Sequence, residues 1–287
     1  MIIFTYDKTF EGLLTCIFEA YYRKLFPDIL LPEQSPLPLF YDSLTRIFTD
    51  GIHSSRVWKG LEKKLSPAGL SVITNCWLSE FPESDILLFR YIRKALDAPF
   101  SIELNFGDPD VLQATQISKK VNNERHRIIQ FTRFQKAIDG TYFAAMEPLY
   151  NALPLTLPYF KDRFADQKWI IYDIKRAYGY YYDLHEVTEI CFTNQEQHLT
   201  TGKLDSSLMA KDEPLFQQLW KTYFKSIGIK ERINPKLHRQ HLPVRFWKYL
   251  TEKNKYYSKI NMSKLYVFKT NIITLYHLNN PTVKDSC

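Results

Sequence analysis

The stretch from Lys168 to Asp183 reads KWIIYDIKRAYGYYYD and carries the clearest strand signals in the chain. Residues 168–173 and 178–183 are rich in aromatic and β-branched side chains, a composition typical of β-strands. Side chains alternate along a strand, so Tyr181 faces away from Tyr180 and Tyr182. We expect one of these faces to lie in a core and the other at the surface, where a tyrosine ring could stack on an unpaired base.

Strand patterns also occur on either side of this stretch. Residues 141–147 and 187–192 are expected to be strands, and residues 158–164 have the pattern of a helix. A strand, a helix and then several strands predict a mixed, mainly antiparallel sheet backed by helices. The predicted fold class is therefore α+β.

The N-terminal part has a different pattern. A β-prone run at residues 2–6 precedes apolar residues at helical spacing, and the prolines of residues 27–38 indicate a loop. A mostly helical region follows to Leu96, with a helix start at Ser66-Pro67. We therefore divide the chain into a mainly helical region with an N-terminal strand at 1–110, a basic α+β region at 111–253, and a tail of uncertain order at 254–287.

Residues 110–138 are expected to form one or two helices with two distinct faces. The apolar face would hold Ile128, Phe131, Phe134 and Ile138, and the basic face would hold Arg125, His126, Arg133 and Lys136. Arg127 falls nearer the apolar face and would need a partner there, for which Glu147 is one candidate. A later helix beginning at Pro214 is expected to bury one apolar stripe, formed by Phe216, Leu219, Trp220, Tyr223 and Phe224.

Charge is distributed unevenly along the 287 residues, whose net charge is +7. Residues 1–115 contain 11 Lys and Arg against 15 Asp and Glu, a net of −4, and residues 116–287 contain 27 against 16, a net of +11. This asymmetry indicates one half that faces a polyanion and one half that packs or meets a partner. A basic surface without a ligand is the alternative reading.

Cations interleaved with aromatic rings favour a nucleic-acid surface, because cations hold phosphates and flat rings accept bases. The candidate nucleic-acid-binding residues are Arg125, His126, Arg133, Lys136, Lys175, Arg176, Arg232, Lys236, His238, Arg239, His241, Arg245 and Lys248. Within residues 232–248, Pro235 and Pro243 are expected to divide the segment into a turn and a short aromatic helix.

Three carboxylates, Glu147, Asp166 and Asp173, are candidates for general acid–base chemistry. Pairing with a nearby arginine is the more common use of such groups. We predict no metal site and no cofactor, because the four cysteines lie far apart and the chain shows no glycine-rich phosphate loop. Apolar runs are too short to cross a bilayer and no signal pattern opens the chain, so a cytoplasmic protein without membrane contact is expected.

Several separated segments resemble those of a bacterial family of DNA metabolism proteins, the family that carries domain of unknown function 4130. These segments are Tyr6–Thr15 (YDKTFEGLLT), Arg133-Phe134, Glu147–Leu155 (EPLYNALPL), Arg163–Asp173 (RFADQKWIIYD) and Asn234–Tyr249 (NPKLHRQHLPVRFWKY). The resemblance extends over residues 1–253. It assigns no catalytic residue, so none is transferred to this chain.

The resemblance implies a role in DNA repair, because family members are typically paired with a DNA modification or repair radical S-adenosylmethionine (SAM) protein. Related versions are fused to a uracil-DNA glycosylase-like domain. Our first hypothesis is a DNA-binding accessory protein that acts with this radical SAM partner. The alternatives are an enzyme acting on damaged or modified bases, and a scaffold for the radical SAM partner.

Overall fold

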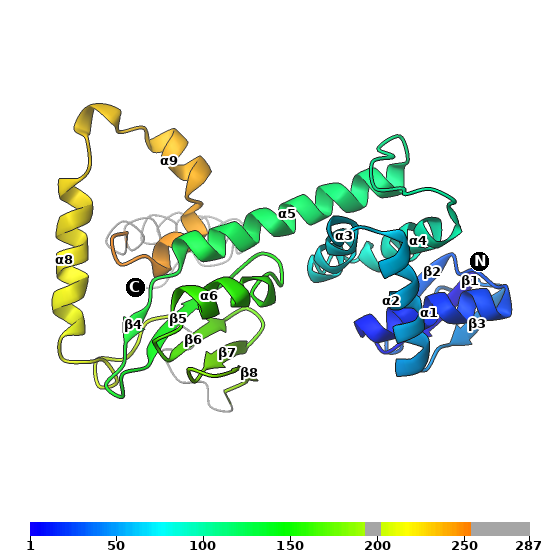
Figure 1. The fold of residues 1–287 in the computed structure, drawn as a ribbon, viewed down its shortest axis with the longest axis horizontal. Coiled ribbons are helices and arrows are strands. Elements are labelled where there is room, and N and C mark those ends of the chain that lie inside the picture. Colours follow the sequence, from blue (N-terminus) through cyan, green and yellow to red (C-terminus); the bar gives the residue numbers. More distant parts are fainter. Residues whose placement is uncertain (193–201, 254–287) are drawn as a thin grey trace, which may run out of the picture. The chain divides into compact units, whose positions relative to one another are not determined.

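The computed structural model describes residues 1–192 and 202–253, and the chain divides into two compact units (Figure 1). The first unit holds residues 1–127 and 149–156, and the second holds residues 128–148 and the chain from Leu157 on. Each unit has a sheet of its own. No helix in the described ranges is long and apolar enough to cross a membrane.

The first unit contains a three-stranded parallel sheet. Its strands are β1 (Ile2–Tyr6), β2 (Ile29–Pro32) and β3 (Ser43–Arg46), in the order β2-β1-β3. Strand β1 confirms the predicted N-terminal strand. The loop predicted at residues 27–38 is wrong over Ile29–Pro32, which form β2, and is confirmed for residues 33–38. Pro32 ends β2 at the edge of the sheet, where a missing N–H is tolerated.

Helices account for most of the first unit. They are α1 (Phe10–Arg23), α2 (Gly51–Lys64), α3 (Pro67–Leu78), α4 (Ser84–Asp97), α5 (Pro109–Phe131) and the short 3₁₀ helix η1 (Pro154–Thr156). The side chains of Thr9, Asp50 and Ser66 cap α1, α2 and α3 by accepting backbone N–H groups. Residue Ser66 therefore confirms the helix start expected there.

One continuous apolar core holds the first unit together. Phe4 of β1 is fully buried in it with Leu13 and Ile17 of α1, Leu61 of α2 and Ile92 of α4. The helical spacing of Leu13 and Ile17 places both side chains on the buried face of α1. The first unit therefore has the hydrophobic core expected of an independent domain.

The second unit contains a five-stranded mixed sheet. Its strands are β4 (Gln135–Lys136), β5 (Tyr142–Met146), β6 (Trp169–Asp173), β7 (Tyr178–Tyr182) and β8 (Val187–Ile190), arranged in that order. Only the β5–β6 pair is parallel, and α6 (Leu157–Arg163) lies in the connection between these two strands. This sheet confirms the predicted α+β fold class.

Aromatic side chains pack α6 against the sheet. The ring of Phe160 in α6 lies 6.1 Å from that of Trp169 in β6, which in turn lies 5.3 Å from Tyr182 in β7. Tyr182 is 3% exposed, whereas Tyr180 on the same strand donates a hydrogen bond to Glu189 of β8. Tyr182 therefore packs in the core of the second unit.

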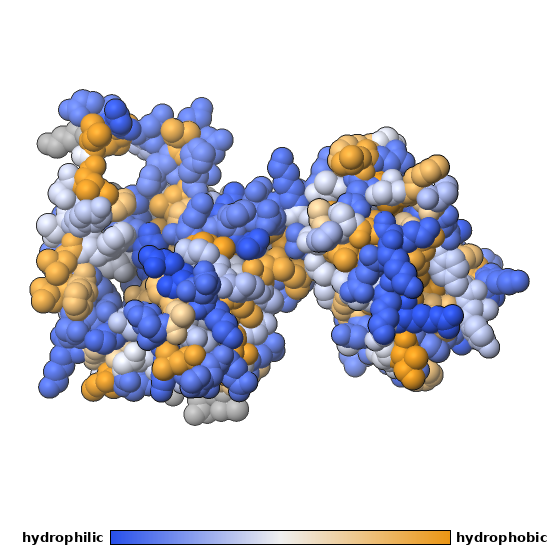
Figure 2. All heavy atoms as spheres, in the orientation of Figure 1, coloured by the Kyte–Doolittle hydropathy of each residue, from blue (hydrophilic) through white to orange (hydrophobic). Residues whose placement is uncertain are grey.

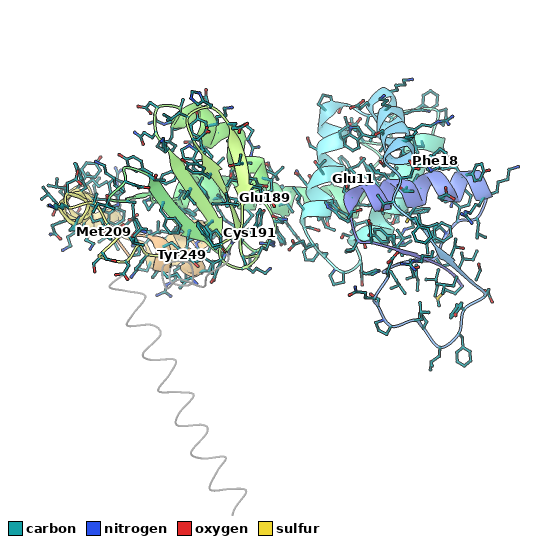
Figure 3. The ribbon with its side chains drawn as sticks, turned by 90° about the horizontal axis from the view of Figure 1, so that it is seen from below. Glu11, Phe18, Glu189, Cys191, Met209 and Tyr249 are labelled. Atoms are coloured by element: carbon teal, nitrogen blue, oxygen red, sulfur yellow. The ribbon has the colours of Figure 1, made fainter. Side chains whose placement is uncertain are left out.

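Helix α5 ends earlier than predicted. It stops at Phe131, and Gln135 and Lys136 form β4, which pairs with β5. Ala137 then bridges to Met209, a residue marked in Figure 3. The predicted basic helix face through Lys136 is therefore wrong, because pairing with Tyr142 and Phe143 extends the backbone where the apolar spacing alone would continue a helix.

Four elements complete the described part of the second unit: α8 (Glu213–Ser226), the 3₁₀ helices η2 (Lys230–Arg232) and η3 (Val244–Tyr249), and α9 (Pro235–His241). The predicted helix at Pro214 is confirmed, but its stripe is not buried. Four of its five residues are exposed, from 37% for Trp220 to 56% for Phe216, and Phe224 is half-buried. The helical period identified the face correctly, but the described segments contact it only in part, with Glu252 at Trp220 and Lys253 at Phe224.

Candidate nucleic-acid interface

Four of the predicted phosphate-binding cations hold carboxylates instead. The pairs are Arg133–Glu252 at 3.0 Å, Lys136–Asp212 at 3.4 Å, Arg176–Asp173 at 2.7 Å and Lys248–Glu147 at 2.7 Å. A cation in an ion pair must give up that partner before it can neutralise a phosphate. These four residues therefore contribute less to a phosphate surface than the sequence suggested.

The Arg176–Asp173 pair is a structural element of the turn between β6 and β7. Asp173 is fully buried and accepts hydrogen bonds from the backbone N–H groups of Lys175 and Arg176 and from Nη1 of Arg176. Burial raises the pKa of Asp173, and the hydrogen bond from Arg176 opposes that shift. The arginine-pairing alternative is thus confirmed for Asp173, whose carboxylate no solvent reaches.

The other two carboxylate candidates are more accessible. Glu147 is partly exposed and bound to Lys248, and Asp166 is exposed on the loop after α6. In the described ranges, no three His, Cys, Asp or Glu side chains gather as a metal ion would require. Glu147 is thus engaged in an ion pair and Asp166 is exposed, and neither arrangement by itself defines a reaction.

The candidates on α5 lie in the first unit. His126 is exposed and Arg125 is partly buried, with no hydrogen-bond acceptor within the described chain for its buried Nε atom. Arg127 pairs with Glu124 at 3.3 Å, and Glu124 also accepts the backbone N–H of Leu149. The sequence had offered Glu147 as the partner of Arg127, and that assignment is wrong because a carboxylate one helical turn away is closer.

The remaining basic candidates gather near α9. Arg232, Lys236, Arg239 and His241 are exposed within ten residues of chain, and we call these four residues the α9 surface. None of them forms an ion pair with a residue in the described ranges. Lys236 and Arg239 are three positions apart on α9 and therefore lie on the same face of the helix.

Local sequence explains why α9 forms where only a turn was predicted. The side chain of Asn234 accepts the backbone N–H of Leu237, and Pro235 occupies the first turn of the helix. Asparagine at the cap followed by proline is a standard helix start, so this signal was present in the sequence. The expected aromatic helix after Pro243 is confirmed as η3.

Three further candidates lie outside the α9 surface. His238 is half-buried with its ring 6.0 Å from that of Trp247, and burial together with the nearby Lys253 lowers the pKa of His238. The guanidinium of Arg245 lies over the ring of Phe246 at 4.7 Å. Lys175 is exposed on the β6–β7 turn. His238 and Arg245 therefore pack against aromatic rings of the second unit.

Comparison with known proteins gives one family match. The family model described as domain of unknown function DUF4130 matches residues 82–252, more than half of the chain. No curated protein matches. Among solved structures, the pGpG-specific phosphodiesterase PggH from Vibrio cholerae is similar, with 10% sequence identity, a TM-score of 0.29, and coverage of 79% of this chain and 99% of that chain. A TM-score this low supports no conclusion about fold or activity.

Proposed function

The chain belongs to the DUF4130 family, which is defined by a domain of unknown function, and from that premise we propose that it is a DNA-binding accessory protein in DNA repair or base modification. The α9 surface is proposed to hold backbone phosphate. Its support is one observation: Arg232, Lys236 and Arg239 are exposed and form no ion pair with any described residue.

This observation favours DNA because polyanion binding draws on cations that are free to replace condensed counterions. Each phosphate contact releases such counterions, so affinity depends steeply on salt. Contacts to phosphate carry no sequence information, which suits a protein that presents DNA to another enzyme. The proposed partner is the radical SAM protein that the family resemblance implies.

A salt series tests the proposal. Fluorescence anisotropy with single-stranded and duplex DNA would measure affinity of the full chain at several salt concentrations. The double variant Lys236→Ala/Arg239→Ala is expected to reduce the slope of log affinity against log salt by about 2, about 1 for each contact removed. Sequence preference should stay unchanged.

The matched control removes the same charge elsewhere. Lys59 and Lys63 are exposed on α2, and Lys59→Ala/Lys63→Ala should leave the salt slope as it is. An equal loss in both double variants would mean that net charge, and not the α9 surface, governs binding. Absence of binding to either DNA at low salt would overturn the proposal.

The two alternatives give different results. If the purified chain forms product on lesion-containing oligonucleotides and Glu147→Gln or Asp166→Asn abolishes that product, the chain is an enzyme. If the radical SAM protein co-purifies with the chain, and the α9 surface of the chain does not bind DNA, the chain is a scaffold. Both experiments use the same purified protein as the salt series.

A further inference from the structure

Helix α8 presents an apolar face to solvent. Phe216, Leu219, Trp220 and Tyr223 lie at helical spacing, with Ile227 just past the last turn, and all five are at least 37% exposed. We call them the α8 apolar face. Hydrophobic atoms gather on the surface over this helix in Figure 2. Soluble proteins rarely leave a contiguous apolar patch of this kind uncovered, so the face indicates a binding surface.

Hydrogen bonds and an ion pair connect α8 to the rest of the second unit. Glu213 in its first turn accepts the backbone N–H of Lys136, and Lys136 also pairs with Asp212. Farther along, Nε1 of Trp220 donates to Glu252 at 2.8 Å. These bonds fix the position of α8 in the second unit. The α8 apolar face is therefore exposed on a helix that is anchored to the rest of the unit.

The described chain ends beside α8. Nζ of Lys253, the last described residue, lies 5.3 Å from the ring centre of Phe224, and Phe224 follows Tyr223 on α8. The described chain therefore ends next to α8. A helix of 14 residues is about 21 Å long, and the 34 residues beyond Lys253 can reach much farther than that.

The segment beyond Lys253 has the composition that an apolar surface requires. Nine of the fourteen residues from Leu265 to Leu278 are apolar or aromatic, and that stretch contains no Asp or Glu. Burying these side chains against α8 would remove both apolar surfaces from water. The eleven residues from Asn254 to Lys264 span up to about 36 Å when extended, enough to cross the helix.

We propose that residues 265–278 pack on the α8 apolar face of the same chain. Covalent attachment favours this occupant over a second copy, because a tethered segment has an effective concentration on the order of millimolar. The proposal is independent of DNA binding. In this arrangement, the α8 apolar face is covered only when the C-terminal segment is present.

Cross-linking tests the proposal in the full chain. The variant Tyr223→p-benzoylphenylalanine places a photoreactive group on the α8 apolar face. Irradiation should join it to a peptide within residues 265–278 in a product that migrates as a monomer. The matched variant Gln218→p-benzoylphenylalanine lies on the opposite side of α8, at an exposed position, and should give no such peptide. Cross-links to a second copy, or to no peptide beyond Lys253, would overturn the proposal.

A second measurement does not depend on a photoreactive residue. Ile272→Asp/Leu275→Asp adds two charges to the apolar stretch, and Thr282→Asp/Ser286→Asp adds the same two charges outside it. Hydrogen exchange in residues 215–227 should become at least tenfold faster in the first variant and stay unchanged in the second. Equal exchange in both variants and the unaltered chain would show that α8 is not covered by this segment. Circular dichroism verifies that each variant is folded.

Discussion

The carboxylate of Glu252 accepts a hydrogen bond from Nη2 of Arg133 over 3.0 Å, although 119 residues separate them in the chain. Its second oxygen accepts Nε1 of Trp220, and the Glu252 side chain is only 3% exposed. One buried carboxylate thus joins the segment that follows α5, helix α8 and the last described turn. Three segments of the second unit depend on it for their mutual position.

Replacing Glu252 by glutamine tests this junction. The variant keeps an acceptor for Trp220 but removes the charge that Arg133 faces, so the free energy of unfolding should fall by about 1–3 kcal/mol. Urea unfolding followed by circular dichroism measures the loss. The control Glu33→Gln breaks the exposed pair with Arg46 and should change little. Equal losses in the two variants would contradict a structural role for Glu252.

The sheet of the second unit was predictable because its signals are local. Trp169–Asp173 and Tyr178–Tyr182 each carry the composition of a strand, and both strands were found where expected. Strand β2 was not predicted because its residues lie among prolines, and its pairing with β1 depends on a helix crossing between them. The end of α5 was missed for a similar reason: β4 exists only because β5 pairs with it.

The candidate interface was predictable only in part. Sequence identified the basic segment that became the α9 surface, but it could not show that Arg133 and Lys136 would be neutralised. Their partners, Glu252 and Asp212, lie far away along the chain. The apolar stripe on α8 was also predictable only in part. Helical spacing identifies an apolar face but does not identify the segment that covers it.

Asp173 is expected to act in folding and not in catalysis. Asp173→Ala would leave the Arg176 side chain, 10% exposed, without its buried partner, so unfolding free energy should fall by about 3 kcal/mol. Asp166→Ala alters an exposed carboxylate and should change stability by less than about 0.5 kcal/mol. Thermal or urea unfolding of the two variants makes the comparison. A stable Asp173→Ala variant would be inconsistent with this assignment.

Gly179 permits a close approach between β7 and β6. A Cβ atom there would lie 2.5 Å from the carbonyl oxygen of Ile171, so Gly179→Ala must displace backbone and should cost about 1–3 kcal/mol. Gly60 in α2 has room for a methyl group, with its nearest neighbour at 3.5 Å. Gly60→Ala should therefore stabilise the first unit by up to about 1 kcal/mol. Opposite shifts of the unfolding midpoint are expected, and two shifts of the same sign would refute the argument.

Acid sensitivity of the first unit should depend on Asp108. The hydrogen bond from Lys94 lowers the pKa of Asp108, and backbone N–H groups of Val111 and Asp110 add to that effect. The unfolded chain then binds the proton more tightly, so the stability that Asp108 provides is present above about pH 4 and is lost as pH falls through its folded-state pKa.

The variant Asp108→Asn retains a side chain that can cap α5 and removes only the charge. It should be less stable than the unaltered chain near pH 7, by up to about 1 kcal/mol because the pair with Lys94 is near the surface. The difference should shrink toward zero as the pH falls below the folded-state pKa of Asp108. Glu62→Gln, which removes an exposed charge from α2, should show no such convergence. Unfolding midpoints measured from pH 7 down to pH 2 decide the matter, and a difference that persists at the lowest pH would mean that Asp108 stabilises the fold by shape and not by charge.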